Sequence, residues 1–374
     1  DPVDNRDHAR MNGDTGHASP LWFVLLAVTS VQGIATFSSL TLAATAPVVA
    51  ADIGVPVEFI GFQIALVYAG ASLISTGAGF LLRRWGPGRV SQISLVLCGG
   101  GAVLMAVPSV PVIAFGSLFM GLGYGMTNPS GAELLMRITP AHRRNIVYSI
   151  KQTGIPIGGM MAGALAPVTA ESFGWQSAPL IGAACCILLA CLLQPWRNGW
   201  DTSRNPAARL DSTAFEAMTI IWRMPALRWM GLAGFNYAFI QLAISTFAVT
   251  ILVTEADFSL IAAGAVLAAV QAAGVAGRLV WGWVADRRGI GEELLIAMGV
   301  TNVIGAVTMM WIAPDWPVWV VYLFFVVYAG VIFGTAALSV LADIMGSVSN
   351  AFLIVAVLAA IGTLALMNVR RLNR

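Results

Sequence analysis

GFLLRRWG at Gly79–Gly86 and GWVADRRG at Gly282–Gly289 share one spacing, Gly-x3-charge-Arg-x-Gly. Glycine permits tight turns and the close approach of helices, and the charges can cap the ends of neighbouring helices. One copy lies in each half of the chain, which indicates an internal repeat of the fold. The residues of this repeat with a predicted conformational role are Gly79, Arg84, Gly86, Gly282, Asp286, Arg287 and Gly289.

The composition indicates that lipid surrounds most of the chain. Of the 374 residues, 58% are hydrophobic and 10% are charged, and the mean hydropathy is +0.82, which predicts an all-α membrane protein. The net charge of +2 argues against a nucleic-acid partner. The three histidines lie outside the apolar runs and the four cysteines inside them, with no catalytic or metal-binding grouping. We therefore expect no enzyme activity, no cofactor and no metal site.

The apolar runs predict about eleven transmembrane helices, because a helix needs roughly 20 apolar residues to cross a bilayer. The expected spans are Leu21–Val49, Phe59–Leu82, Val90–Val107, Val112–Met136, Ile146–Thr169, Ala178–Leu193, Trp229–Val253, Leu260–Val284, Leu294–Ile312, Val318–Ile344 and Ala351–Met367.

Arginines occur in alternate connections, which orients the spans because short cytoplasmic loops are enriched in basic residues. The amino terminus is therefore predicted to lie in the cytoplasm. The expected membrane is a bacterial-type inner membrane. We expect residues 1–20 to form a cytoplasmic tail and residues 21–194 a six-helix bundle. Residues 195–227 are expected to form a cytoplasmic linker with an amphipathic helix, and residues 228–374 an incomplete second bundle.

The arginine pattern breaks near the end of the chain. The loop MGSVSN at residues 345–350 should be cytoplasmic but has no arginine, whereas Arg370, Arg371 and Arg374 would lie outside. One additional crossing before Ala351 would remove both discrepancies. We therefore predict that the eleventh of twelve helices is missing; the alternative is a long tenth span that bends into a re-entrant segment.

The repeated loop resembles the signature loop of the major facilitator superfamily, which follows the second and the eighth helix. The copy around Asp286 matches the family pattern, whereas Arg83 stands where the family has aspartate in the first copy. The resemblance implies two pseudo-symmetric helical bundles that work by alternating access. It also implies that Asp286 caps the fifth helix near Asn145.

Two charge pairs are predicted as gates between conformations. Arg84 could pair with Glu133 at the end of the fourth span, and Arg287 with Asp343 at the end of the tenth. The alternative is that both acids are solvated helix ends.

Lys151 is the only lysine in the chain, and it lies near the cytoplasmic start of the fifth span. At about 100° per residue it shares a helix face with Gly154, Gly158 and Gly159. Because such small residues mark contacts between membrane helices, we expect the ammonium to point into the protein. Snorkelling to the cytoplasmic lipid phosphates is the alternative.

A second cation, Arg278, shares a face of the eighth span with Gln271. A charge inside the membrane costs about 2.5–3.5 kcal/mol on insertion scales, and no Asp or Glu lies in the middle of a span. An anionic substrate would neutralise Lys151 and Arg278, although an arginine at this place is also common in the family whatever the substrate.

KQTGIPIGG at residues 151–159 resembles a fifth-helix signature of bacterial facilitators that take up small organic anions. Similarly, an arginine in the eighth helix resembles the carboxylate-binding arginine of oxalate/formate- and monocarboxylate-type members. Further polar candidates for the binding site are Gln32, Asn128, Gln152, Asn236 and Tyr237.

The sequence thus predicts a secondary active transporter of a small, carboxylate-like organic anion. Its expected partners are the lipid bilayer, the anion, and a coupling proton or counter-anion, and we expect a monomer. One alternative is a drug or cation efflux transporter, which would need a buried acid in the first or fourth span. The other is a truncated membrane protein that does not transport.

Overall fold

The computed structural model describes residues 19–140, 143–208, 245–254, 256–288 and 316–329, with a few single residues between 223 and 308. These residues form helices and connecting turns, as the composition predicts, and contain no strand. The helices of the first half are α2 (Leu21–Ala44), α3 (Ala46–Ile53), α4 (Ile60–Trp85), α5 (Pro87–Met105), α6 (Val110–Ile138), α7 (Arg144–Gln152), α8 (Gly154–Phe173), α9 (Ser177–Leu192) and α10 (Arg197–Trp200), with 3-10 turns at Val57–Phe59 and Gln194–Trp196. The second half contributes α13 (Leu260–Arg288) and α15 (Val318–Ala329).

Seven helices in the described part of the chain are long and apolar enough to cross a membrane. They correspond to the first six predicted spans and to the eighth. Of the seventh span, the structure describes the short apolar helix Ser245–Thr254. The region around Met345, on which the predicted missing helix depends, and the amphipathic part of the linker lie outside the described residues, so both stay predictions.

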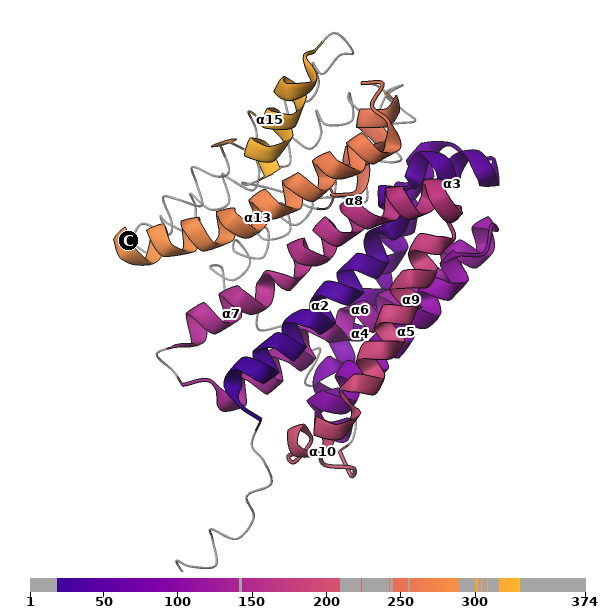
Figure 1. The fold of residues 1–374 in the computed structure, drawn as a ribbon. Helices are drawn as coiled ribbons and strands as arrows, with labels where there is room; N and C mark the ends of the chain where they lie inside the picture. Colours follow the sequence, from indigo (N-terminus) through magenta and orange to yellow (C-terminus); the bar gives the residue numbers. More distant parts are fainter. Residues whose placement is uncertain are drawn as a thin grey trace, which may run out of the picture.

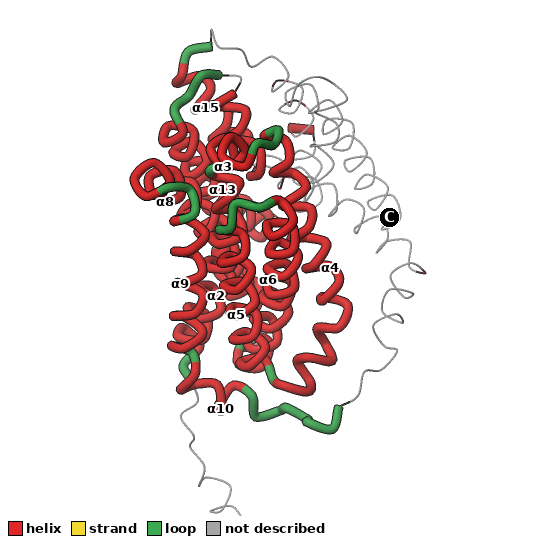
Figure 2. Tube along the Cα trace, turned by 90° about the vertical axis from the view of Figure 1, so that its right-hand side faces the viewer, coloured by secondary structure: helices red, strands yellow, loops and turns green. Residues whose placement is uncertain are grey.

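The long helices of the first half run side by side, with α2 contacting α6, α8 and α9 (Figure 1). Between Val31 and Ala44 every residue of α2 except Ile34 is buried. A helix that is apolar all round is expected in such a central position. On the other side of α8, α13 lies along it and α15 contacts α13, while Figure 2 shows α10 at one end of the helices and α3 at the other.

The fifth span is two helices rather than the single helix expected over Ile146–Thr169. α7 ends at Gln152, and α8 begins two residues later at Gly154. Pro156 accounts for the break, because it has no amide hydrogen to donate to the carbonyl of Gln152 and its ring collides with that carbonyl in a regular helix. The hydroxyl of Thr153, at the break, donates to the carbonyl of Ile150 at 2.6 Å. Lys151 therefore lies in the last turn of a short helix.

Two glycines of the predicted face, Gly154 and Gly158, lie against α2, whereas the third, Gly159, lies against α13. A Cβ added to Gly154 would lie 2.6 Å from the carbonyl oxygen of Thr29, and one added to Gly158 would lie 2.8 Å from the amide nitrogen of Phe37. Both neighbours are backbone atoms, which cannot move aside as a side chain could. The absence of side chains at these two positions thus lets α2 and α8 approach closely.

A second close contact joins α8 to α13. Gly159 lies against the side-chain amide of Gln271, and a Cβ on Gly163 would lie 2.7 Å from the carbonyl oxygen of Gly264. Pro167 also lies close to Gly264. Helices from the two halves of the chain therefore meet through small residues.

We predict that Gly158→Ala lowers the free energy of unfolding by about 1–3 kcal/mol, because the added methyl group overpacks the contact with the α2 backbone. Gly77→Ala is the matched control, since a Cβ at Gly77, also in a helix, meets no atom within 4 Å. Alanine favours helices over glycine, so this control should not destabilise the protein. Thermal and denaturant unfolding in detergent measure both variants, and equal stability of the two would contradict the prediction.

Asp201, after α10, caps the start of α5. Gly86 precedes that helix with a φ of 84° and has no side chain to cap it. The Asp201 carboxylate accepts hydrogen bonds from the amides of Gly88 at 2.7 Å and Arg89 at 3.1 Å. Such amides at a helix start are usually satisfied by the N-cap side chain, and a negative charge there is also favoured by the helix dipole. The chain that leaves α9 thus supplies a cap that the local sequence lacks.

Burial raises the pKa of the Asp201 carboxyl above its ordinary value, although the hydrogen bond from Gly88 and the charge of Arg197 favour the ionised form. The amides of Gly88 and Arg89 need an acceptor oxygen, which an asparagine side chain also has. Asp201→Ala should lower the free energy of unfolding by about 0.5–2 kcal/mol, the usual value of an N-cap. Asp201→Asn keeps an acceptor and should cost less. Unfolding in detergent tests this order, and an equal loss in both variants would show that the charge dominates.

Candidate functional site

Lys151, in the last turn of α7, is 1% exposed and its side chain contacts α6. Its ammonium donates to the backbone carbonyl of Asn128 at 3.1 Å and also to the side-chain oxygen Oδ1 of the same residue. A Cβ on Gly131 would lie 3.2 Å from Cε of the lysine, so this glycine leaves room for the aliphatic stem. The lysine is thus directed into the protein, onto one turn of α6.

The charge of Lys151 is only partly compensated. An ammonium has three donors, and Asn128 accepts from it at two atoms that are both formally neutral. Among the residues that the structure describes, no carboxylate forms an ion pair with it. A buried charge is costly without an opposite charge, so an anion placed beside this ammonium would be stabilised.

Asn128, unlike Lys151, is exposed. The neighbouring residue, Thr127, donates its hydroxyl to Oε1 of Gln32 on α2 at 3.2 Å. Gln32 is 2% exposed. The structure therefore brings Lys151 and Asn128 into contact. It places Gln32 nearby, where the hydrogen bond from Thr127 links α6 to α2.

Two tyrosines that the sequence does not single out lie near this part of α6: Tyr124, one helical turn from Asn128 on the same helix, and Tyr68 on α4. Tyr124 precedes Asn128 by four residues, which places both on one face of the helix. Its ring meets that of Tyr68 on α4 at 5.8 Å between centroids, edge to face. Its hydroxyl lies 3.4 Å from the hydroxyl of Thr36 on α2. The four-residue spacing could have identified Tyr124, whereas Tyr68 and Thr36 come from other helices.

Of the other predicted binding residues, the structure places Gln152 and Gln271. Gln152 is half-buried at the end of α7. Gln271 is buried against Gly159 and donates to the hydroxyl of Ser245 at 3.3 Å, which makes it part of the contact between α8 and α13. Arg278 lies in α13, but the structure does not describe its side chain, and Asn236 and Tyr237 lie outside the described residues.

The first of the two predicted gating pairs is not formed. Glu133 accepts from Arg137 at 2.6 Å, and Arg84 donates to the carbonyl of Ala208 at 3.2 Å. Residues four apart on one helix meet without any rearrangement, which explains why Arg137 rather than Arg84 pairs with Glu133. Near Gly79, the atom closest to an added Cβ is Nη1 of Arg83, at 3.8 Å, so no other described helix approaches that glycine closely.

The copy of the motif in the second half is described only in part. Gly282, Asp286 and Arg287 lie in α13. The side chains of Asp286, Arg287 and Asn145, the expected partner of Asp286, are not described. Gly289 and Asp343 lie outside the described residues.

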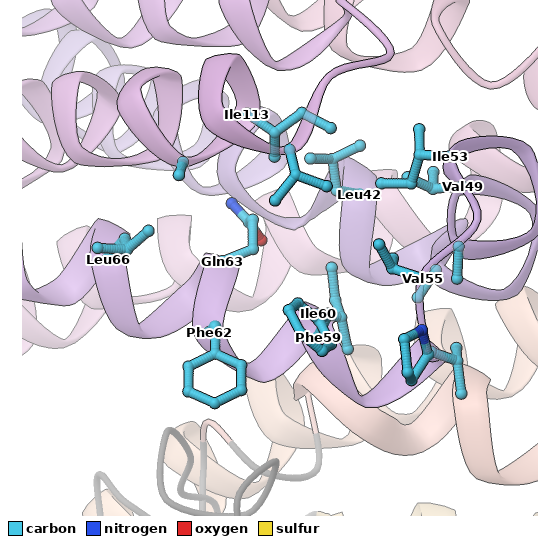
Figure 3. Close-up of a pocket in the computed structure, with 16 residues that line it drawn as sticks. Leu42, Val49, Ile53, Val55, Phe59, Ile60, Phe62, Gln63, Leu66 and Ile113 are labelled. Carbon is cyan, nitrogen blue, oxygen red and sulfur yellow. The ribbon is translucent and has the colours of Figure 1, made fainter.

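A cavity of about 90 Å³ lies near the other end of α6, away from Lys151 (Figure 3). Ile113 lines it, and the 15 residues from there to Asn128 correspond to roughly 22 Å of helix. Gln63 is a polar side chain in a largely apolar lining, and its amide nitrogen donates to the hydroxyl of Ser117 at 3.2 Å. None of the described residues that line the cavity is charged.

Proteins similar to this chain are membrane transporters. The 4-hydroxybenzoate transporter PcaK of Pseudomonas putida is 24% identical over 47% of this chain and 39% of its own length. A probable hexose phosphate transport protein of Chlamydia trachomatis is 21% identical over 73% of this chain and 66% of its own length. The 2-nitroimidazole transporter of Escherichia coli is 27% identical over 45% and 42%. The chain thus spans less than two thirds of these relatives.

Solved structures share the fold at low sequence identity. The xylose transporter XylE of E. coli, in a partially occluded inward-open conformation, superposes with a TM-score of 0.64 at 17% identity, over 94% of this chain and 91% of that one. The nucleoside transporter NupG gives a TM-score of 0.65 at 15% identity, over 94% and 90%. The family model of the Major Facilitator Superfamily matches residues 28–367. Together with the helical architecture, this match shows that the chain is a multi-pass membrane protein and belongs to the Major Facilitator Superfamily of secondary transporters.

Proposed function

We propose that this transporter carries a small organic anion and that Lys151 binds its negative charge. The observation that supports this most strongly is the buried ammonium, which is 1% exposed and has only the neutral oxygens of Asn128 as described partners. An anion that binds there removes the cost of an unpaired buried charge. A carboxylate would gain charge-assisted hydrogen bonds, which are stronger than those Lys151 makes with the amide.

Asn128 is proposed to be the residue that the substrate displaces. Its side chain is exposed, and its Oδ1 accepts a hydrogen bond from the buried ammonium of Lys151. In the absence of substrate, its Oδ1 partly compensates the ammonium. A substrate carboxylate that takes the place of Oδ1 supplies the full opposite charge. Each transport cycle would then exchange one partner of Lys151 for another as the two halves alternate their access to each side of the membrane.

The relatives are consistent with this substrate class. Two of those described above are named for anions, 4-hydroxybenzoate and hexose phosphate. The arginines of alternate loops favour a cytoplasmic amino terminus, and the inner membrane of a bacterium is the proposed location. Lys151 lies near the cytoplasmic start of its span in that orientation, so its site would be reached from the cytoplasmic side in the inward-open state.

Replacement of Lys151 tests the proposal. We expect Lys151→Gln to lower uptake of the best anion in a carboxylate panel roughly ten- to hundredfold, because hydrogen bonds to charged groups contribute about 1.5–3 kcal/mol. Lys151→Arg keeps the charge and should retain part of the uptake. The assay is uptake by proteoliposomes that contain the full chain, with monodispersity and thermal unfolding as checks on folding. Unchanged anion uptake by folded Lys151→Gln would refute the role of the lysine.

Two substitutions of Asn128 separate charge from shape. Asn128→Asp places a carboxylate beside Lys151 in a side chain of nearly the same size, so the ammonium is neutralised within the protein and anion uptake should fall at least about tenfold. Asn128→Ala removes the neutral partner and should keep uptake within a few-fold of the parent. Measured in the same proteoliposomes, equal uptake by the two variants would contradict the proposed exchange of partners at Lys151.

A further inference from the structure

The pair Tyr68 and Tyr124 lies next to the proposed anion site and takes no part in the binding of charge. Tyr124 and Asn128 are separated by one helical turn on one face of α6, a rise of about 6 Å. The ammonium of Lys151 is hydrogen-bonded to Asn128. The site therefore places a positive charge at one level and an aromatic pair about one turn away from it.

Both tyrosines keep part of their surface exposed, although they lie among packed membrane helices. Their rings meet edge to face, with centroids 5.8 Å apart and planes inclined by 69°. In such a pair, each ring covers at most one face of the other. Aromatic rings favour further aromatic partners in offset-stacked or edge-to-face arrangements, so the pair can accept a third ring.

The spacing fits one class of anion. A carboxylate oxygen that accepts a charge-assisted hydrogen bond lies about 2.7–2.9 Å from the ammonium. If the carboxylate is attached directly to a benzene ring, that ring then lies about one helical turn from the lysine, which is the level of Tyr124. An aliphatic acid of similar length reaches the same place but gains only burial of apolar surface there.

We infer that the substrate is an aromatic carboxylate, with its carboxylate on Lys151 and its ring against Tyr124 and Tyr68. This inference rests on the proposed function, because it assigns the carboxylate to the same lysine. The hydroxyl of Tyr124 lies 3.4 Å from that of Thr36, which is 2% exposed, so α2 fixes the position of the ring. Tyr124 thereby determines the specificity for aromatic over saturated rings.

A pair of matched acids tests the inference. Benzoate and cyclohexanecarboxylate carry the same charge on rings of six carbons, and only benzoate is aromatic. We expect benzoate to bind the purified full chain roughly two- to twelvefold more tightly, which is the value of an aromatic pair converted to an affinity ratio. Titration calorimetry in detergent measures both affinities, and competition for uptake in proteoliposomes measures the same ratio during transport.

Tyr124→Leu should abolish the preference for benzoate while both acids still bind. Tyr124→Phe keeps the ring, loses only the contact of its hydroxyl with Thr36, and should retain the preference, so it is the matched control. Lys151→Gln should weaken the binding of both acids by similar factors. Thermal unfolding verifies that each variant is folded.

The outcomes separate the two proposals. If the two acids bind equally to the parent, or if Tyr124→Leu keeps the preference, the aromatic assignment is overturned while the anion site stands. If neither acid binds, and Lys151→Gln leaves the uptake of every transported compound unchanged, both the anion site and the aromatic assignment are refuted. A preference for benzoate that is lost in Tyr124→Leu and kept in Tyr124→Phe supports both.

Discussion

A positive charge inside a membrane protein must find a partner, because lipid cannot solvate it. In this chain that constraint is concentrated at Lys151, whose described partners are two neutral oxygens of one asparagine. These hydrogen bonds allow the ammonium to be buried in the folded protein, but they do not neutralise its charge. Around it, Gly131 leaves room for the stem of the lysine, and the break after Gln152 ends the helix that carries it.

The break in the fifth span also divides its contacts. Beyond it, α8 uses Gly154 and Gly158 against α2, and Gly159 and Gly163 against α13. The first two of these glycines therefore join α8 to the first half of the chain, and the other two join it to the second half. Because backbone meets backbone or a buried amide, these contacts tolerate little change in side-chain size.

The sequence predicts much of this fold, because hydrophobic length is a local signal. The first six spans and the eighth could be marked within several residues, and the glycine face and inward direction of Lys151 follow from helical periodicity. The break in the fifth span could have been recognised at Pro156. The length of the apolar run, taken alone, predicts a single helix.

What could not be predicted depends on contacts between distant segments. No local pattern indicates that Asp201 caps α5 or that Tyr68 meets Tyr124. The pair of Glu133 and Arg137, in contrast, follows helical spacing and could have been predicted. The role of Gln271 was predicted from its polarity, yet its amide lies against Gly159 in a contact between helices.

The cap on α5 also changes where the connection between the two halves begins. After Asp201, the amide of Asn205 donates to the carbonyl of Arg83 at 2.7 Å, and Arg84 donates to Ala208. The chain is therefore fastened along the end of α4 rather than leaving from the end of α9. The part of the predicted linker up to Ala208 is thus attached to the first half beside the end of α4. A circularly permuted or split transporter should accordingly be divided after Ala208, so that the first half keeps its own cap.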